Sequence, residues 1–123
     1  LEGVFYHLRW MLECQSRLVK TSNPIRFVGG GALAPVSCQM LADITGRTIE
    51  TVHSPQNVGA VGAAAVVAVG LGLIPDIECT KQFIPVAETY RPDMKKHAKY
   101  KPYYKTFKKL YAANKNLFKT VSK

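Results

Sequence analysis

Residues 25–35 read IRFVGGGALAP, and this stretch sets the architecture of the chain. The apolar run 25–28 leads into Gly29, Gly30 and Gly31, and apolar residues at helical spacing follow from 36 to 44. This order predicts a buried strand over 25–28, a glycine turn and a helix over 35–45. Glycines let backbone N–H groups approach a phosphate without an intervening side chain, near the positive end of a helix. The turn is a candidate phosphate site, although a tight strand-to-helix connection is an equal alternative.

The other segments of the chain are predicted from their periodicity. We expect a helix over 2–20, a strand over 47–52, an apolar helix over 58–73 and an amphipathic helix over 102–121. A short extended piece is expected at 83–86, and a turn at 90–93. The inward stripe of the first helix is expected to hold Val4, Leu8, Met11, Leu12, Gln15, Leu18 and Val19.

The predicted order is helix, strand, helix, strand, helix and a C-terminal amphipathic helix, which places the chain in the α/β class. Two parallel strands joined through helix 35–45 would form a right-handed βαβ unit. Two strands alone make a poor sheet, and the chain starts without Met inside a predicted helix. We therefore expect a fragment of a longer protein with further strands upstream. Open strand edges and apolar helix faces also predict a homo-oligomer.

The positive charge of the chain is concentrated at its C-terminal end. The net charge is +9, and ten lysines with no arginine and no acid follow Met94. A basic helix of this kind could bind nucleic acid or an anionic membrane surface. Arginine, the residue preferred for phosphate and base contacts, does not occur there. We interpret the lysines as a solvated helix face, and we expect no nucleic acid partner.

Cysteine and hydropathy patterns narrow the class of protein further. Cys14, Cys38 and Cys79 form no Cys-x-x-Cys pair and do not cluster with histidines, so we expect free, mostly buried thiols and no metal site. The uncharged run 58–74 is slightly short for a membrane span and rich in Gly, Ala and Val. We expect it to be a buried helix of a soluble, cytoplasmic protein with no membrane partner.

Three linked motifs resemble one known family. They are IRFVGGGALAP at 25–35, QMLADITG at 39–46 and NVGAVGAA at 57–64. In this order and at this spacing they resemble the C-terminal part of the FGGY carbohydrate kinases, most closely the xylulokinases. The resemblance covers nearly all of residues 1–123. It implies part of a ribonuclease-H-like, actin-like ATPase domain, with the N-terminal sugar domain absent from this chain.

The resemblance implies a kinase that transfers the γ-phosphate of ATP, with Mg²⁺, to a hydroxyl of a ketopentose such as D-xylulose. It places Gly29, Gly30 and Gly31 near the α-phosphate and ribose, and Ala34 at the adenine-contacting position, where many relatives have Asn or Ser. A side chain at Gly30 is expected to fill nucleotide space and to strain the backbone. The family's catalytic base and sugar contacts lie upstream. No catalytic or metal-ligating residue is assigned here, and this chain alone is expected to be inactive.

Asp43 and His53 are the remaining polar residues for which the sequence suggests a role, and a second class of function is also considered. Asp43 lies within a helix and is expected to have a packing or hydrogen-bonding role rather than a catalytic one. His53, in the loop before the apolar helix, could contact a ligand or be an exposed loop residue without a role. The alternative function is a non-catalytic interaction module that keeps the actin-like half-fold.

Overall fold

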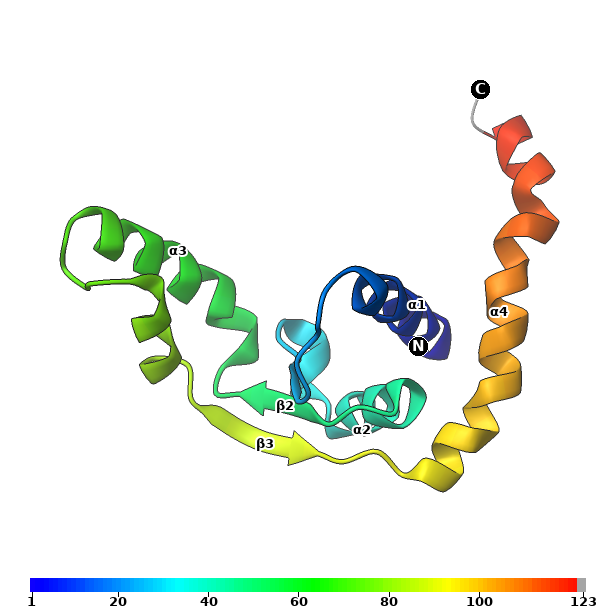
Figure 1. Ribbon diagram of the computed structural model, residues 1–123, viewed down its shortest axis with the longest axis horizontal. Helices are drawn as coiled ribbons and strands as arrows, with labels where there is room; N and C mark the ends of the chain where they lie inside the picture. The colour runs from blue at the N-terminus through cyan, green and yellow to red at the C-terminus, as the bar shows by residue number, and fades with distance from the viewer. Residues whose placement is uncertain (122–123) are drawn as a thin grey trace.

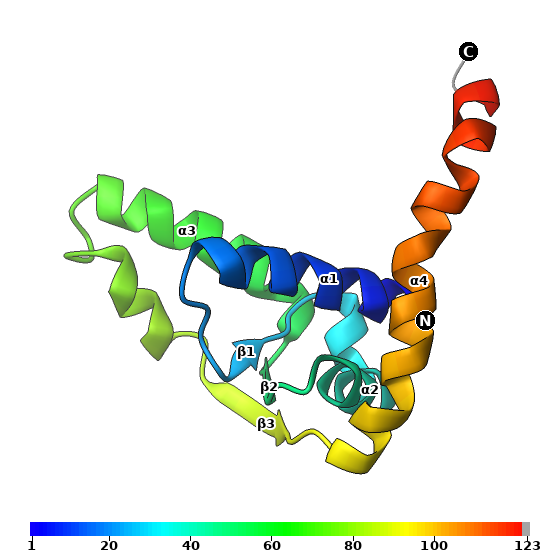
Figure 2. The same ribbon diagram turned by 45° about the vertical axis from the view of Figure 1, so that its right-hand side comes forward.

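The computed structural model describes residues 1–121, in which a small sheet lies between helices (Figures 1 and 2). The elements are α1 (Glu2–Leu18), β1 (Ile25–Arg26), η1 (Gly30–Leu33), α2 (Pro35–Thr45), β2 (Ile49–Val52), η2 (Pro55–Asn57), α3 (Val58–Gly70), η3 (Ile77–Gln82), β3 (Val86–Tyr90) and α4 (Met94–Val121). The η elements are short 3-10 helices. Helix α3 extends to one side of the sheet, and α4 stands at the other.

The sheet contains the predicted βαβ unit and one strand more than predicted. Strand β1 pairs with β2 in parallel, with Ile25 opposite Ile49, and α2 connects them. Strand β3 pairs with β2 antiparallel, with Tyr90 opposite Ile49. The prediction of an extended piece at 83–86 and a turn at 90–93 was therefore wrong in position. Pairing with β2, a contact between distant segments, draws residues 86–90 into the ladder.

Helix α2 has the predicted bounds because local signals define both of its ends. Pro35 occupies its first turn, where a missing N–H is harmless. Gly46 follows its last residue in the left-handed conformation, with φ +71°, and donates its N–H to Ala42 O. The core around α2 is made of Phe5, Tyr6, Leu41, Ala42, Ile44, Ile49 and Tyr104.

The inward face of helix α1 shares Leu8 with the predicted stripe but is centred on other residues. Phe5 and Tyr6 are its buried residues, whereas Val4 is exposed and Leu18 is 85% exposed. The predicted stripe followed the aliphatic residues and left out the two aromatic ones. The Tyr6 ring lies 5.7–6.2 Å from three aromatic rings of α4, and the Phe5 ring lies 6.4 Å from Phe27. Aromatic packing therefore sets the rotation of this helix.

Helix α4 begins at Met94, eight residues before the predicted start at Pro102. The Asp93 carboxylate caps it by accepting the N–H groups of Lys95 and Lys96. Pro102 is exposed within the helix, which continues through it. The predicted start was wrong because the Asp93 cap begins the helix earlier. Of the ten C-terminal lysines, Lys123 lies outside the described residues.

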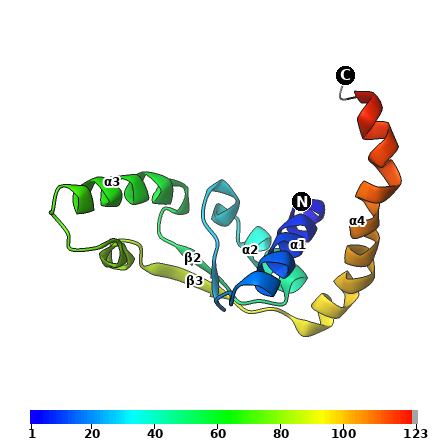
Figure 3. The ribbon, with the colours of Figure 1, turned by 45° about the horizontal axis from the view of Figure 1, so that its top comes forward.

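Helix α3 is largely exposed, which contradicts the prediction of a buried helix. Ala65 is its one buried residue among those described, and Val66 is 64% exposed. The principal neighbours of α3 are η2 and η3, and the α3–η3 arm lies apart from α1 and α2 (Figure 3).

The prediction of mostly buried cysteine thiols was wrong for two of the three. Cys38 is buried, Cys79 is half-buried and Cys14 is exposed.

Candidate functional site

The glycine turn begins where β1 ends and is tied to the loop after β2. Gly29 has φ +92° and ψ −177°, a backbone region open essentially to glycine alone. Its N–H donates to Pro55 O at 2.8 Å. Since β1 and β2 are parallel, this contact joins the carboxyl ends of both strands. Ligands in open α/β sheets bind at such edges.

The three glycines have different surroundings. A Cβ atom built on Gly29 or Gly30 would meet nothing within 4 Å, whereas one on Gly31 would lie 3.1 Å from Phe27 Cζ. Gly31 is thus a close-packing position, while Gly29 and Gly30 border open space. The expectation of backbone strain at Gly30 was wrong, because the conformation that requires glycine occurs at Gly29.

The turn also offers backbone donors. Within residues 1–121, the N–H groups of Gly30 and Gly31 have no hydrogen-bond partner, because they precede the first bonded turn of η1. Gly30 and Gly31 form the first half of η1, a 3-10 helix between β1 and α2 that the sequence did not predict. Ala34 is the exposed residue before α2, and its carbonyl accepts the N–H groups of Ser37 and Cys38.

A shallow pocket of about 200 Å³ lies beside the turn, between η1, the end of β2 and β3. Its lining includes Leu33, Thr51, His53, Glu88 and Tyr90. The structure brings the glycine turn next to this pocket through the Gly29–Pro55 contact, but the glycines and Ala34 do not line it. Glu88 and Tyr90 were missed in the sequence because only the β2–β3 pairing places them here.

Glu88 and Tyr90 form a polar pair at this pocket. The Tyr90 hydroxyl donates to the Glu88 carboxylate, and this hydrogen bond, with burial second, raises the pKa of Tyr90 to about 12. The phenol therefore remains a neutral hydrogen-bond donor at neutral pH. His53 lies exposed at the pocket and has no hydrogen bond within the described residues, so both interpretations of His53 remain open.

Asp43 has the hydrogen-bonding role that was predicted for it. Its carboxylate is buried and accepts 2.8 Å hydrogen bonds from Gln39 Nε2 and from the Asp93 N–H. Lys96 Nζ lies 3.9 Å from its second oxygen. Asp43 therefore connects α2 to the start of α4, and its oxygens are already engaged within the protein.

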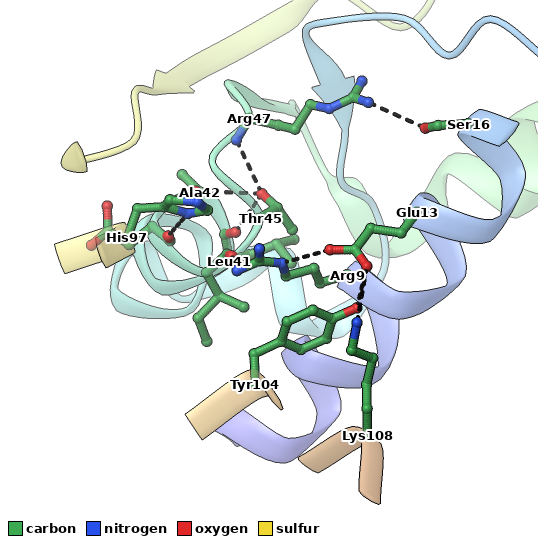
Figure 4. A network of polar contacts seen from close by, with 12 residues as sticks. Arg9, Glu13, Ser16, Leu41, Ala42, Thr45, Arg47, His97, Tyr104 and Lys108 are labelled. Carbon is green, nitrogen blue, oxygen red and sulfur yellow. Dashed lines mark hydrogen bonds and ion pairs between the residues drawn. The ribbon is translucent and has the colours of Figure 1, made fainter. Parts of the chain in front are cut away.

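A second polar cluster lies at the C-terminal end of α2, where α1 and α4 meet it (Figure 4). Glu13 accepts hydrogen bonds from Arg9 Nε at 3.1 Å and from the Tyr104 hydroxyl at 2.7 Å, and Lys108 Nζ lies 3.6 Å away. The Arg9 guanidinium also stacks 4.2 Å from the Tyr104 ring centroid. This cluster joins α1 to α4, and no motif of the sequence predicted it.

Residues 1–121 contain neither a metal-binding cluster nor a membrane-spanning helix. No group of three or more His, Cys, Asp or Glu side chains that could hold a metal ion occurs among them. Within the same residues, none of the helices combines the length and hydrophobicity needed to cross a membrane.

Comparisons with known proteins place the chain in a family. Residues 1–71 match the model of the FGGY family of carbohydrate kinases, C-terminal domain. The chain is 32% identical over 118 residues to a Staphylococcus epidermidis xylulose kinase, covering 95% of the chain and 24% of that protein. It is 30% identical over 118 residues to a Bacillus subtilis xylulose kinase, covering 95% of the chain and 23% of that protein.

A solved structure agrees with these sequence matches. The ligand-bound xylulose kinase from Lactobacillus acidophilus superimposes with a TM-score of 0.76 and 25% identity, over 98% of this chain and 24% of that one. The chain therefore spans about a quarter of the length of the curated relatives that it matches. On the family match over more than half of its residues, the chain belongs to the FGGY family of carbohydrate kinases.

Proposed function

We propose that residues 1–123 are the C-terminal, nucleotide-side portion of a longer kinase with a partial ribonuclease-H-like, actin-like domain. The support is the match to a C-terminal domain model and the much greater length of the relatives. In this proposal β1 and β2 belong to a larger sheet, whose other strands lie in the rest of the protein. The sugar-binding domain also lies there. A cytoplasmic location and a sugar substrate are part of the same proposal.

The proposed activity is transfer of the γ-phosphate of ATP to a hydroxyl of a ketopentose such as D-xylulose. One observation carries it: the turn at Gly29–Gly31 combines open space at Gly29 and Gly30 with N–H groups at Gly30 and Gly31 that bond nothing within residues 1–121. Backbone donors in a side-chain-free turn fit phosphate oxygens. The names of the relatives support a pentulose as the acceptor.

The residues of this chain fit the nucleotide part of such a reaction. Gly30 and Gly31 would donate to phosphate, Gly29 would give the turn its shape, and Ala34 would lie at the adenine-contacting position without a side-chain hydrogen bond. Mg²⁺ bound with the nucleotide would neutralise charge on the transferred group. We assign no catalytic base or metal ligand to this chain, since Asp43 is engaged with Gln39 and Asp93.

The test compares two glycine variants of the full-length protein that contains this chain. Gly30→Val should raise the KM for ATP about tenfold and leave the KM for the sugar unchanged, because a branched side chain would enter the nucleotide space. Gly30→Ala is the matched control, since a Cβ alone at this position meets nothing within 4 Å and should change the KM for ATP less. Initial rates in a coupled assay with D-xylulose and other pentuloses and hexuloses measure both constants.

The results separate the kinase from the alternative interaction module. Equal KM values for ATP in wild type and Gly30→Val would mean that the turn is structural only. A full-length protein without turnover on any sugar would favour the non-catalytic module. The isolated 123-residue chain should show no turnover above background with ATP, Mg²⁺ and D-xylulose, because no base or sugar site is assigned to it.

A further inference from the structure

A polar pocket of about 370 Å³ opens between α1, α2 and α4, at the end of α2 away from the glycine turn. Its polar lining comes from Arg9, Glu13, Ser16, Arg17, Thr45, Arg47 and His97. Helix α2 has 11 residues, and at the usual rise it separates this pocket from the turn by about 16 Å. The pocket is therefore distinct from the proposed nucleotide site.

The charge of the lining is positive. Three arginines face one carboxylate, Glu13. Glu13 is already paired with Arg9 at 3.1 Å and with Lys108 at 3.6 Å. Arg17 and Arg47 thus bring positive charge that no carboxylate within residues 1–121 balances. The pocket favours an anion.

The carbonyl groups at the C-terminal end of α2 are satisfied without Arg17. The last carbonyls of α2 are satisfied by Arg9 Nη1 on Ile44 O at 2.9 Å, His97 Nδ1 on Asp43 O at 2.9 Å and Thr45 Oγ1 on Leu41 O at 2.7 Å. These contacts cap the negative end of the helix without Arg17.

Arg47 and Arg17 differ in how they are held. Arg47 is fixed by Ser22 O, Ser16 Oγ and Thr21 Oγ1, at 3.0–3.3 Å, which orients its guanidinium at the pocket. Arg17 makes no hydrogen bond or ion pair within the described residues and is exposed. A preoriented arginine beside an uncommitted one suits a ligand that several N–H donors can bind at once.

We propose that this pocket binds a small phosphate-bearing anion, with Arg17 and Arg47 as its principal contacts. The guanidinium of Arg17 presents paired N–H donors that match phosphate oxygens. Arg47 adds its positive charge, its Nε–H and one Nη1–H, since its other donors bond Ser22, Ser16 and Thr21. The cavity volume lies in the range of small-molecule sites. The inference rests on the charges and contacts of this pocket and does not depend on the kinase function.

The experiment follows His97 in the full-length protein as a local probe. Histidine is labelled with ¹³C at Cε1, the His97 signal is assigned with His97→Gln, and inorganic phosphate replaces chloride at constant pH and ionic strength. We expect a saturable shift of the His97 signal. Arg17→Ala should weaken this binding about tenfold, whereas Lys20→Ala, which removes a nearby exposed charge, should leave it unchanged. Arg17 is exposed and makes no hydrogen bond or ion pair within the described residues, so the thermal midpoint should not change.

Two comparisons make the result decisive. Acetate should bind more weakly than phosphate, because it carries less charge and fewer acceptor oxygens; an equal response to acetate would overturn the assignment to phosphate. Phosphate bound at the glycine turn would shift the signal of His53, which lies beside the turn, and Arg17→Ala would not weaken that binding. A non-saturable response, or equal effects of Arg17→Ala and Lys20→Ala, would overturn the proposal.

Discussion

Helices α2 and α3 are both mostly apolar, but α2 is buried and α3 is largely exposed. Helix α2 has six buried residues, and α3 has Ala65 alone within the part of the chain that the structure describes. Helix α2 lies between α1, α4 and the sheet, while the principal neighbours of α3 are η2 and η3. Apolar composition shows that a helix prefers burial, but neighbouring elements decide whether it is buried.

The difference is consistent with a chain that spans a quarter of its relatives. Exposed apolar side chains on α3 and just after it include Val66, Val67, Leu71 and Leu73. Exposed apolar side chains gathered on one helix are typical of an interface. We expect α3 to contribute little to the stability of this chain and more in the full-length protein.

Matched truncations in the two helices should have the largest effect. Ile44 is fully buried, so Ile44→Ala should lower the free energy of unfolding by about 2–5 kcal/mol. Val66 is mostly exposed, so Val66→Ala should change it by about 0.5 kcal/mol or less. Urea denaturation of the 123-residue chain, followed by circular dichroism, measures both. Equal losses would contradict the contrast, and the Val66→Ala loss should grow in the full-length protein.

Two left-handed glycines test how tightly each region is packed. Gly46 and Gly72 both have φ +71°, but a Cβ on Gly46 would lie 2.8 Å from His97 Cε1 while one on Gly72 would meet nothing within 4 Å. Gly46→Ala should cost about 1–3 kcal/mol, and Gly72→Ala about 1 kcal/mol for its backbone alone. The difference between their unfolding free energies isolates the steric contact. Equal costs would mean that His97 moves aside freely.

Self-association tests whether the exposed apolar side chains of α3 form the contact between copies of the chain. We expect the 123-residue chain to form a dimer or larger species, and light scattering measures its mass against concentration. Leu71→Lys should weaken association about tenfold by placing a charge beside α3. Leu18→Lys, at an exposed residue of α1, is the control and should have no effect. A monomer at all concentrations would contradict the expectation, and equal effects would place the interface away from α3.

The Glu13 cluster should give a small dependence of stability on pH. Burial raises the pKa of Glu13, but hydrogen bonds from Tyr104 and Arg9 and the charge of Lys108 outweigh it and hold the pKa below its ordinary value of 4.5. This contribution is present above pH 4.5 and is lost as the pH falls through the lower folded-state value.

Glu13→Gln should therefore flatten the acid side of the stability profile, measured as the urea midpoint against pH. Glu78→Gln removes a carboxylate from the exposed pair with Lys81 and should leave the profile unchanged. An unaltered acid limb in Glu13→Gln would show that the α1–α4 contact does not depend on this charge.

Local signals were sufficient for the part of the fold around α2. The apolar run before Gly29, the proline at 35 and the glycine at 46 predicted the bounds of α2 and the parallel βαβ unit. The buried strand predicted over 25–28 was wrong in extent and burial, because β1 is Ile25–Arg26, with Ile25 half-buried and Arg26 exposed. The linked glycine and alanine motifs led to the family. Each of these features depends on residues within a few positions of one another, and backbone conformation responds directly to such neighbours.

Contacts between distant segments decided the rest. The pairing of β3 with β2, the inward face at Phe5 and Tyr6, and the exposure of α3 depend on which elements become neighbours. Only the folded chain shows that Gly29 needs its positive φ while Gly31 packs against Phe27, or that Arg17 and Arg47 line one pocket. Sequence patterns report what each residue prefers, whereas burial, partners and pockets arise from surfaces that meet only after folding.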